Sequence, residues 1–128
     1  MRPLLLDTHV ALWLVMDSHR LGARTREVLE SADGPVLAST ASVWETTIKR
    51  SLGRLAAPDS LWDDIVASGV DIIGISREDA EAVGGLPLHH RDPFDRLLIA
   101  QARRRGATFV TADRRVALYD VGVTDASQ

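Results

Sequence analysis

Cysteine is absent from the 128-residue sequence. A disulfide framework, a thiolate metal site and a cysteine nucleophile are therefore excluded, so any metal ion has to be bound by oxygen or imidazole ligands. Long hydrophobic runs are also missing: none approaches the roughly 20 residues that cross a bilayer, and no apolar secretory segment stands at the start. We therefore expect a cytoplasmic protein that has no membrane partner.

The overall composition is not that of a disordered or fibrous protein. Hydrophobic residues make up 45% of the chain and charged residues 26%, values close to those of globular proteins. A chain of this length suits one cooperative unit, so we expect a single domain over residues 1–128.

Lysine is nearly absent, since Lys49 stands against fourteen arginines. Seven of those arginines fall between His89 and Arg115, with three acids among them, although the net charge of the whole chain is −3. A second run, between Asp59 and Glu81, holds seven acids and one base. Both runs are typical of solvated helix faces, and the basic run would also attract a polyanion such as nucleic acid.

Short apolar segments alternate with helical patterns along the chain. The segments that predict strands cover residues 3–6, 36–38, 71–75 and 108–111, with a last strand near residues 121–123. The segments that predict helices lie within residues 10–16, 24–30, 39–52, 58–69, 76–83 and 92–105. Strands that alternate with helices favour right-handed crossovers and a parallel sheet covered by helices on both faces. The predicted fold class is therefore an α/β three-layer sandwich.

Acidic residues follow two of the predicted strands directly. Asp7 comes after the first strand and Asp113 after the fourth, at the edge of a parallel sheet where ligands bind. Glu45 lies in the first turns of a helix that starts at the same edge. These residues also have structural explanations, because Asp commonly caps helices and Glu45 has the spacing of a capping-box partner of Ser42.

The segment from Asp92 to Asp95 has the pattern of a helix start, with Pro93 at the first helical position. We expect Asp92 chiefly to cap this helix. Asp95 should point toward the same sheet edge as the acids after the strands, because Leu97 and Leu98 have to face the core.

Four carboxylates would then share one site, those of Asp7, Glu45, Asp95 and Asp113. Their mutual repulsion would raise several of their pKa values unless a cation neutralises them. Oxygen ligands favour Mg²⁺ or Mn²⁺. The chemistry that this arrangement suggests is metal-assisted attack of water on a phosphodiester.

Several motifs follow one another along the chain. They are LLLDTHV (residues 4–10), SVWE (42–45) with IK (48–49) and LGRL (52–55), HHRDPFDRLLIAQA (89–102) and VTAD (110–113). In this order they resemble the signatures of the PIN-domain nucleases, and more narrowly those of the VapC-type toxins of bacterial toxin–antitoxin pairs. The resemblance covers essentially the whole chain, and the motif around residues 92–101 is specific.

This resemblance implies a five-stranded parallel sheet between helices, with an acidic, Mg²⁺-dependent site that cleaves RNA. The metal-binding acids are matched by Asp7, Glu45, Asp95 and Asp113, and the supporting hydroxyl positions by Thr8 and Thr111. The resemblance also implies a cognate antitoxin that blocks the site, and it favours a homodimer.

Other residues near the acids are expected to have other roles. Four arginines lie closest to them in sequence and are expected to contact RNA phosphates: Arg91, Arg96, Arg114 and Arg115. A loop pair such as His89 and His90, on a polar surface, is more often neither a metal ligand nor a base. Three tryptophans are expected to be buried in the core rather than to face a partner: Trp13, Trp44 and Trp62.

Two other classes of function compete with a nuclease. A non-catalytic module would use the same fold to hold RNA or a partner protein, but the complete acid set argues against it. A phosphate-handling domain of the receiver or phosphatase type would also place acids at strand ends. That class would need a second acid beside Asp7 and a lysine after a late strand. In this chain Thr8 stands beside Asp7, and the only lysine is Lys49.

Overall fold

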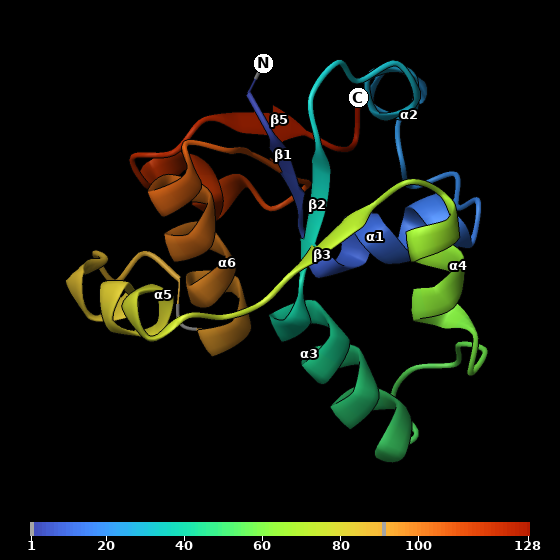
Figure 1. The fold of residues 1–128 in the computed structure, drawn as a ribbon, viewed down its shortest axis with the longest axis horizontal. Helices are drawn as coiled ribbons and strands as arrows, with labels where there is room; N and C mark the ends of the chain where they lie inside the picture. The colour runs from blue at the N-terminus through green and yellow to red at the C-terminus, as the bar shows by residue number, and fades with distance from the viewer. Residues whose placement is uncertain (1, 91) are drawn as a thin grey trace.

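The computed structural model describes residues 2–90 and 92–128 of the chain. A five-stranded sheet lies at its centre, with the strand order β3-β2-β1-β4-β5 (Figure 1). The strands are β1 (Leu4–Leu6), β2 (Val36–Ser39), β3 (Asp71–Ile73), β4 (Thr108–Thr111) and β5 (Val123–Asp125). Each neighbouring pair is parallel, which confirms the predicted sheet.

Two strands differ in extent from the prediction. β3 ends at Ile73, earlier than expected, because Ile73 pairs with Ser39 and the chain enters a helix directly after Ser39. β5 begins at Val123, where the predicted strand ended, since it pairs with the part of β4 from Phe109 to Thr111. The available pairing partner therefore determines the length of these edge strands, and the apolar pattern alone does not.

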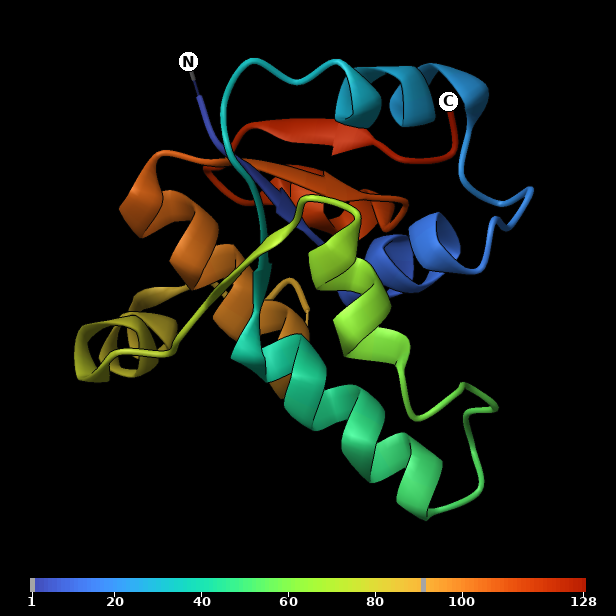
Figure 2. The same ribbon diagram turned by 45° about the vertical axis from the view of Figure 1, so that its right-hand side comes forward.

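Helices cover both faces of the sheet (Figures 1 and 2). They are α1 (Thr8–Val15), α2 (Ala23–Glu30), α3 (Thr40–Ser51), α4 (Leu61–Ala67), α5 (Arg77–Ala82) and α6 (Pro93–Arg105), with short 3-10 turns η1 (Val83–Gly85) and η2 (Arg114–Leu118). α5 and α6 lie on one side of the sheet and α1, α2 and α4 on the other, while α3 extends beyond the end of β2. This arrangement confirms the three-layer sandwich. None of the helices in the described part of the chain is long and apolar enough to cross a bilayer.

The two central strands β1 and β4 are buried on both faces. Neighbouring residues of a strand point to opposite sides of the sheet. Leu5 and Phe109 accordingly pack into the cluster that includes α6, and Leu6 and Val110 pack into the cluster that includes α1 and α4. Since the core holds these strands from both sides, the residues at their ends have well-defined positions.

The predicted start and end of α6 are confirmed. Oδ1 of Asp92 accepts hydrogen bonds from the N–H groups of Phe94 (2.9 Å) and Asp95 (3.1 Å), and Pro93 is the first helical residue. Gly106 ends the helix with a φ of 62°, a left-handed conformation that costs glycine least. α6 therefore carries Asp95 in its first turn, at the carboxyl edge of the sheet.

The prediction for the tryptophans is right for two of the three. Trp13 and Trp62 are partly buried against the core. Trp44 is 59% exposed, and its ring meets that of Phe94 edge-on with 5.3 Å between the centroids. Because Glu45 turns inward and successive helix residues are rotated by about 100°, Trp44 points outward, so the prediction for this residue is wrong.

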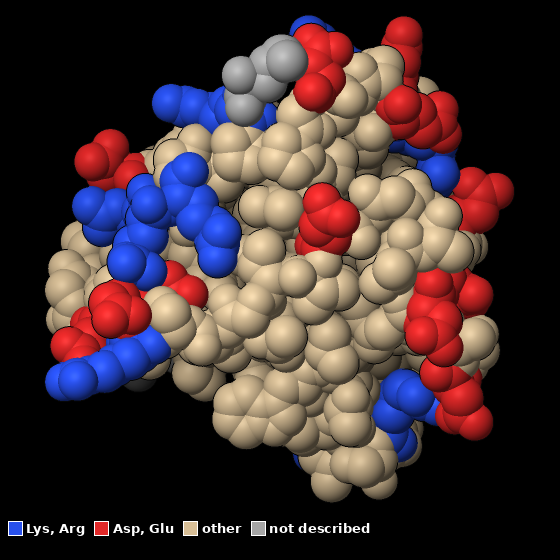
Figure 3. All heavy atoms as spheres, in the orientation of Figure 1, with Lys and Arg blue, Asp and Glu red and all other residues tan. Residues whose placement is uncertain are grey.

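The charged runs lie mostly on exposed helix surfaces, as predicted, but the prediction is wrong for Asp79, which is 1% exposed and forms an ion pair with Arg104 of the basic run. In Figure 3, Lys and Arg gather over α6, whereas Asp and Glu gather along the side of α4. The arginines in the last turn of α6, Arg103, Arg104 and Arg105, are all exposed. They follow Asp95 by eight to ten residues, which is about 12–15 Å along the helix. The basic run is therefore not one continuous surface beside the acids.

Candidate metal centre

Asp7 lies where β1 ends and α1 begins, and it is 7% exposed. Its Oδ2 accepts a hydrogen bond of 2.7 Å from the hydroxyl of Thr111, at the end of β4. Its Oδ1 is buried and has no hydrogen-bond partner among the described residues. Burial is the main cause that raises the pKa of the Asp7 carboxyl above its ordinary value. Nearly all buried polar atoms in proteins are paired, so this oxygen is available to a cation.

Glu45 reaches the same region from the first half of α3 and is 3% exposed. Its Oε1 accepts a hydrogen bond of 2.8 Å from the Thr8 hydroxyl, and its Oε2 accepts one of 2.7 Å from the Lys49 ammonium group. The Thr8 hydroxyl has one proton, and it donates this proton in the hydrogen bond to Glu45. In the 2.7 Å contact between Thr8 and Ser42, the Ser42 hydroxyl is therefore the donor. The hydrogen bond to Glu45 is the main cause that raises the pKa of Lys49.

The capping-box explanation of Glu45 is wrong. The N-cap of α3 is Ser39, whose side chain accepts a hydrogen bond of 3.0 Å from the N–H group of Ala41. Glu45 therefore lies in the second turn of the helix, where its carboxylate has tertiary partners and no capping role.

Asp95 and Asp113 meet at the ring of His90. Nε2 of His90 lies 3.0 Å from Oδ2 of Asp95 and 2.8 Å from Oδ2 of Asp113. Nδ1 of the same ring accepts a hydrogen bond of 3.1 Å from the N–H group of Asp92. His90 is only 4% exposed, so the expectation that it lies on a polar surface is wrong. Sequence offered one signal for it, its place two residues before the cap of α6.

The four predicted acids act on one another electrostatically. The pKa of Asp95 is raised to about 8, first by burial and then by the negative charges of Asp7, Asp92, Glu45 and Asp113. Each of these carboxylates therefore lies within Coulombic reach of Asp95. The structure brings together Asp7, Glu45, Asp95 and Asp113 from four separate parts of the chain.

Asp113 differs from the other acids because a cation already accompanies it. Nη2 of Arg115 donates to Oδ2 of Asp113 over 2.9 Å, and Nε donates to Oδ1 over 3.1 Å. Hydrogen bonding to Arg115 is the main cause that lowers the pKa of Asp113 to about 2. The burial and repulsion that a bound cation would relieve therefore lie on the side of Asp7 and Asp95, whose pKa values are raised.

Three further residues hold the acids in place. The Thr111 hydroxyl donates to Asp7 and accepts from the N–H group of Asp113 at 3.0 Å, so it links two acids. The Thr8 hydroxyl orients Glu45 by donating a hydrogen bond to its carboxylate. Oδ1 of Asp92 is occupied by the first N–H groups of α6.

A divalent cation fits this set of donors. Carboxylate oxygens are the ligands of hard cations, and Asp7 offers a buried oxygen to which no described residue is bonded. Ligand atoms of His90, Asp95 and Asp113 also lie within 4.8 Å of one another. Both oxygens of Glu45 already accept hydrogen bonds, and so do both oxygens of Asp113, although there the donor is the Arg115 side chain, which is 60% exposed. Asp7 and Asp95 are therefore the acids with the freest oxygens, and Asp113 is the third candidate ligand.

The arginines expected to bind RNA have different surroundings. Arg91 lies outside the described residues. Arg114 is exposed, and its charge helps to lower the pKa of Asp125. Arg115 bonds to Asp113 with its side chain 60% exposed. Arg96 departs from the prediction, because its guanidinium group is used inside the protein on backbone carbonyl groups.

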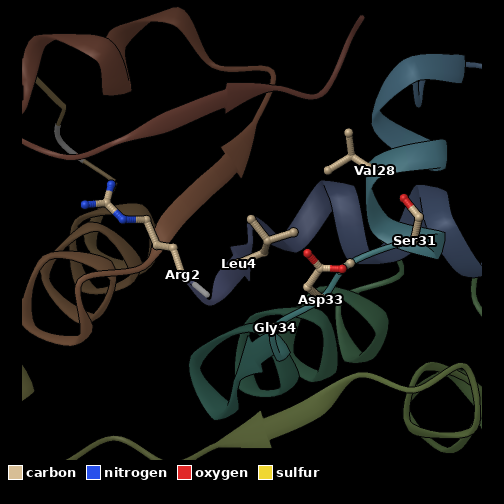
Figure 4. Close-up of a pocket in the computed structure, with 7 residues that line it drawn as sticks. Arg2, Leu4, Val28, Ser31, Asp33 and Gly34 are labelled. Carbon is tan, nitrogen blue, oxygen red and sulfur yellow. The ribbon is translucent and has the colours of Figure 1, made fainter.

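Two open hollows lie at opposite ends of the sheet. The one at the carboxyl edge has a volume of about 610 Å³ and is lined by His89, His90, Asp92 and Arg115. The one at the other end, of about 300 Å³, is lined by Arg2, Leu4, Val28, Ser31, Ala32, Asp33 and Gly34 (Figure 4). Each lining contains one acid, Asp92 in the first hollow and Asp33 in the second. The first hollow is the one beside the acidic cluster, because it is lined by His90, whose ring contacts Asp95 and Asp113.

The PIN domain family matches residues 4–122, and the chain belongs to this family. Within it, the chain is 33% identical over 120 residues to ribonuclease VapC22 of Mycobacterium tuberculosis (strain ATCC 25618 / H37Rv), with 91% of each protein covered.

Solved structures support the same assignment of the fold. VapBC2 from Rickettsia felis, bound to a DNA fragment from its promoter, superposes with a TM-score of 0.71 at 15% identity, covering 95% of this chain and 97% of that one. VapC20 of Mycobacterium tuberculosis, a sarcin–ricin loop cleaving toxin, superposes with a TM-score of 0.54 at 16% identity, covering 90% and 93%. At these identities the likeness establishes the fold alone.

Proposed function

We propose that this protein is a metal-dependent endoribonuclease and the toxin component of a type II toxin–antitoxin pair. One observation carries the proposal: a buried oxygen of Asp7 that has no partner among the described residues lies in a cluster of acids where burial, and then the neighbouring carboxylates, raise the pKa of Asp95 to about 8. A bound cation would relieve both features. Membership of the PIN domain family and the identity to ribonuclease VapC22 support RNA hydrolysis as the reaction.

Asp7, Asp95 and Asp113 would hold the ion, which we propose to be Mg²⁺ or Mn²⁺ because oxygen ligands suit both. Such an ion lowers the pKa of water and offsets negative charge on the phosphodiester. Glu45 completes the acid set from within Coulombic reach of Asp7 and Asp95, while Lys49 limits the repulsion that Glu45 adds. Thr8 and Thr111 support the carboxylates, and Asp92 caps the helix that carries Asp95.

RNA would enter through the hollow at the carboxyl edge of the sheet, where His89 and Arg115 form part of the lining. Arg115 can turn from Asp113 to a phosphate because most of its side chain is exposed. Arg114, beside it in the chain, is also exposed. We propose these two arginines as phosphate contacts.

We further propose a cognate antitoxin and a homodimer. The antitoxin is supported by the similar fold of VapBC2, whose structure is that of a complex. Apolar surface is available for protein contacts on and beside α3, where Trp44 and Leu52 are each 59% exposed. Light scattering of the purified protein, alone and with the product of the neighbouring gene, would test both partners.

Cleavage of RNA by the purified protein tests the function directly. We expect cleavage with Mg²⁺ or Mn²⁺, none with EDTA, and none by the Asp7→Asn and Asp95→Asn variants, which should stay folded. Asp120→Asn is the matched control, because the side chain of Asp120 is 99% exposed and lies outside the centre.

The proposal fails if Asp7→Asn and Asp95→Asn cleave RNA as fast as the parent. Tight binding of RNA or antitoxin without cleavage or divalent-ion binding would instead support a non-catalytic module. Calorimetry with each ion separates these outcomes and identifies the metal.

A further inference from the structure

The guanidinium group of Arg96 holds the chain segment that leads into α6. Its donors reach carbonyl oxygens spread over eight residues of that segment. Nη1 donates to the carbonyl groups of Pro87 (3.0 Å) and His90 (3.3 Å), and Nη2 donates to those of Val83 (3.0 Å) and Leu86 (3.3 Å). A planar group with several fixed donors can bind such a set at once, whereas an ammonium group on a flexible stem cannot.

The same segment is also held by Tyr119, which is 4% exposed. The phenol oxygen accepts hydrogen bonds from the N–H groups of His89 (3.1 Å) and His90 (2.8 Å). Nη1 of Arg96 also lies 3.4 Å from this oxygen. The backbone around His90 is therefore tied through both its N–H and its C=O groups, with Arg96 and Tyr119 in contact.

The orientation of the His90 ring follows from this anchoring. Nδ1 accepts the N–H group of Asp92, so the hydrogen-bond network assigns the proton of the neutral ring to Nε2. Nε2–H then points at Oδ2 of Asp95 and Oδ2 of Asp113. A protonated Nε2 has no lone pair for a metal ion, so His90 serves as a hydrogen-bond donor between two acids that belong to different elements.

We propose that Arg96 is a positioning residue for the metal centre, which acts by anchoring His90 so that Nε2–H holds Asp95 and Asp113 at a fixed separation. The inference rests on the proposed function for the identity of the ion-binding acids. It differs from the role expected for Arg96 from sequence, which was direct contact with RNA phosphate. The two roles predict different measurements.

Arg96→Lys keeps the positive charge but loses the planar set of donors. We expect the dissociation constant for Mn²⁺, measured by calorimetry, to rise about tenfold or more, as is common when partners of metal ligands are removed. The turnover number for a labelled RNA should fall, while KM for the RNA should stay unchanged. Arg105→Lys is the matched control, since Arg105 is exposed at the far end of α6.

Variants of His90 test whether Arg96 acts through this ring. His90→Ala should weaken Mn²⁺ binding by about the same factor of ten or more. His90→Gln, which offers an amide donor, should recover most of the affinity. Because Arg96 acts through His90, adding Arg96→Lys to His90→Ala should cost little more. This comparison holds even if Arg96→Lys also lowers the melting temperature.

Three results would overturn the inference. One is a raised KM for RNA with unchanged Mn²⁺ affinity in Arg96→Lys, which would make Arg96 a phosphate contact. Another is additive losses in the double variant. The third is an Nδ1–H tautomer of His90 in nitrogen NMR spectra. Mn²⁺ binding without RNA cleavage by the parent protein would refute the proposed function alone, while absence of Mn²⁺ binding would refute both.

Discussion

The hydroxyl of Thr111 donates a 2.7 Å hydrogen bond to Oδ2 of Asp7, although the two residues lie 104 positions apart in the sequence. The same hydroxyl accepts the N–H group of Asp113. Thr111, at the end of β4, thus connects Asp7, which follows β1, to Asp113, which follows β4. This hydrogen bond lowers the pKa of Asp7 against the larger, opposite effect of burial.

Thr111→Val should weaken the centre with little change of shape. Loss of a buried hydrogen bond to a charged group should cost about 1.5–3 kcal/mol in the free energy of unfolding, and the pKa of Asp7 should rise further. Ion affinity should fall as a result. Urea unfolding and calorimetry with Mn²⁺ would measure both effects, and Thr111→Ser, which keeps the hydroxyl, should behave like the parent protein. Equal ion affinity in the Val and Ser variants would contradict this role.

The metal-free protein should lose stability as the pH rises toward 9. The pKa of Asp95 is raised from 3.8 to about 8, so the folded state holds this proton more tightly than the unfolded state. Its stabilising effect is complete below pH 3.8 and disappears as the pH passes through about 8. Urea unfolding in EDTA at pH 5.5 and at pH 8.5 would measure the difference.

Asp95→Asn should reduce that pH dependence, leaving the part that comes from the raised pKa of Asp7, and should make the metal-free protein more stable than the parent at high pH. Asp113 does not interfere in this range. Its pKa is lowered to about 2, so its contribution is lost only as the pH falls below about 4. A parent protein with equal stability at both pH values would contradict the assignment.

Binding of Mg²⁺ near pH 7 should release a proton from the protein. A large fraction of Asp95 is protonated at that pH, because its pKa is about 8, and a coordinating carboxylate has to be ionised. Calorimetry in buffers of different ionisation enthalpy would count the protons. Asp95→Asn should abolish the release, whereas Asp120→Asn should leave it unchanged. Bound ion should also stabilise the fold, by about 2.7 kcal/mol at a concentration 100 times its dissociation constant.

Lys49→Met should destabilise the protein at neutral pH by about 1–2 kcal/mol, since it removes a hydrogen-bonded cation from a buried carboxylate. Lys49 donates to Oε2 of Glu45, and the Lys49 side chain is 41% exposed, so the loss is smaller than for a fully buried pair. The double variant Glu45→Gln with Lys49→Met should recover most of the loss, because no charge is then left unpaired. Thermal unfolding of Lys49→Met, of Glu45→Gln alone and of the double variant would show this, and additive losses would contradict it.

Local patterns in the sequence determined the elements and the edge at which the acids lie. The cap at Asp92, the proline that follows it and the glycine at position 106 define α6, because each acts on the backbone within a few residues. Asp7 and Asp113 directly follow apolar strands, so parallel pairing of β1 with β4 was enough to bring them to one edge.

The partners of the side chains depended on the tertiary structure alone. Spacing along the chain does not show whether Glu45 bonds to Ser42 or to Thr8, or whether Trp44 is covered. It also does not show whether Arg96 faces solvent or the carbonyl groups of the segment before α6. Each of these outcomes depends on how neighbouring elements pack and on which buried polar groups need a partner. Sequence therefore determined the secondary structure and the acid set, while packing across the sheet decided which groups orient those acids and which side chains remain on the surface.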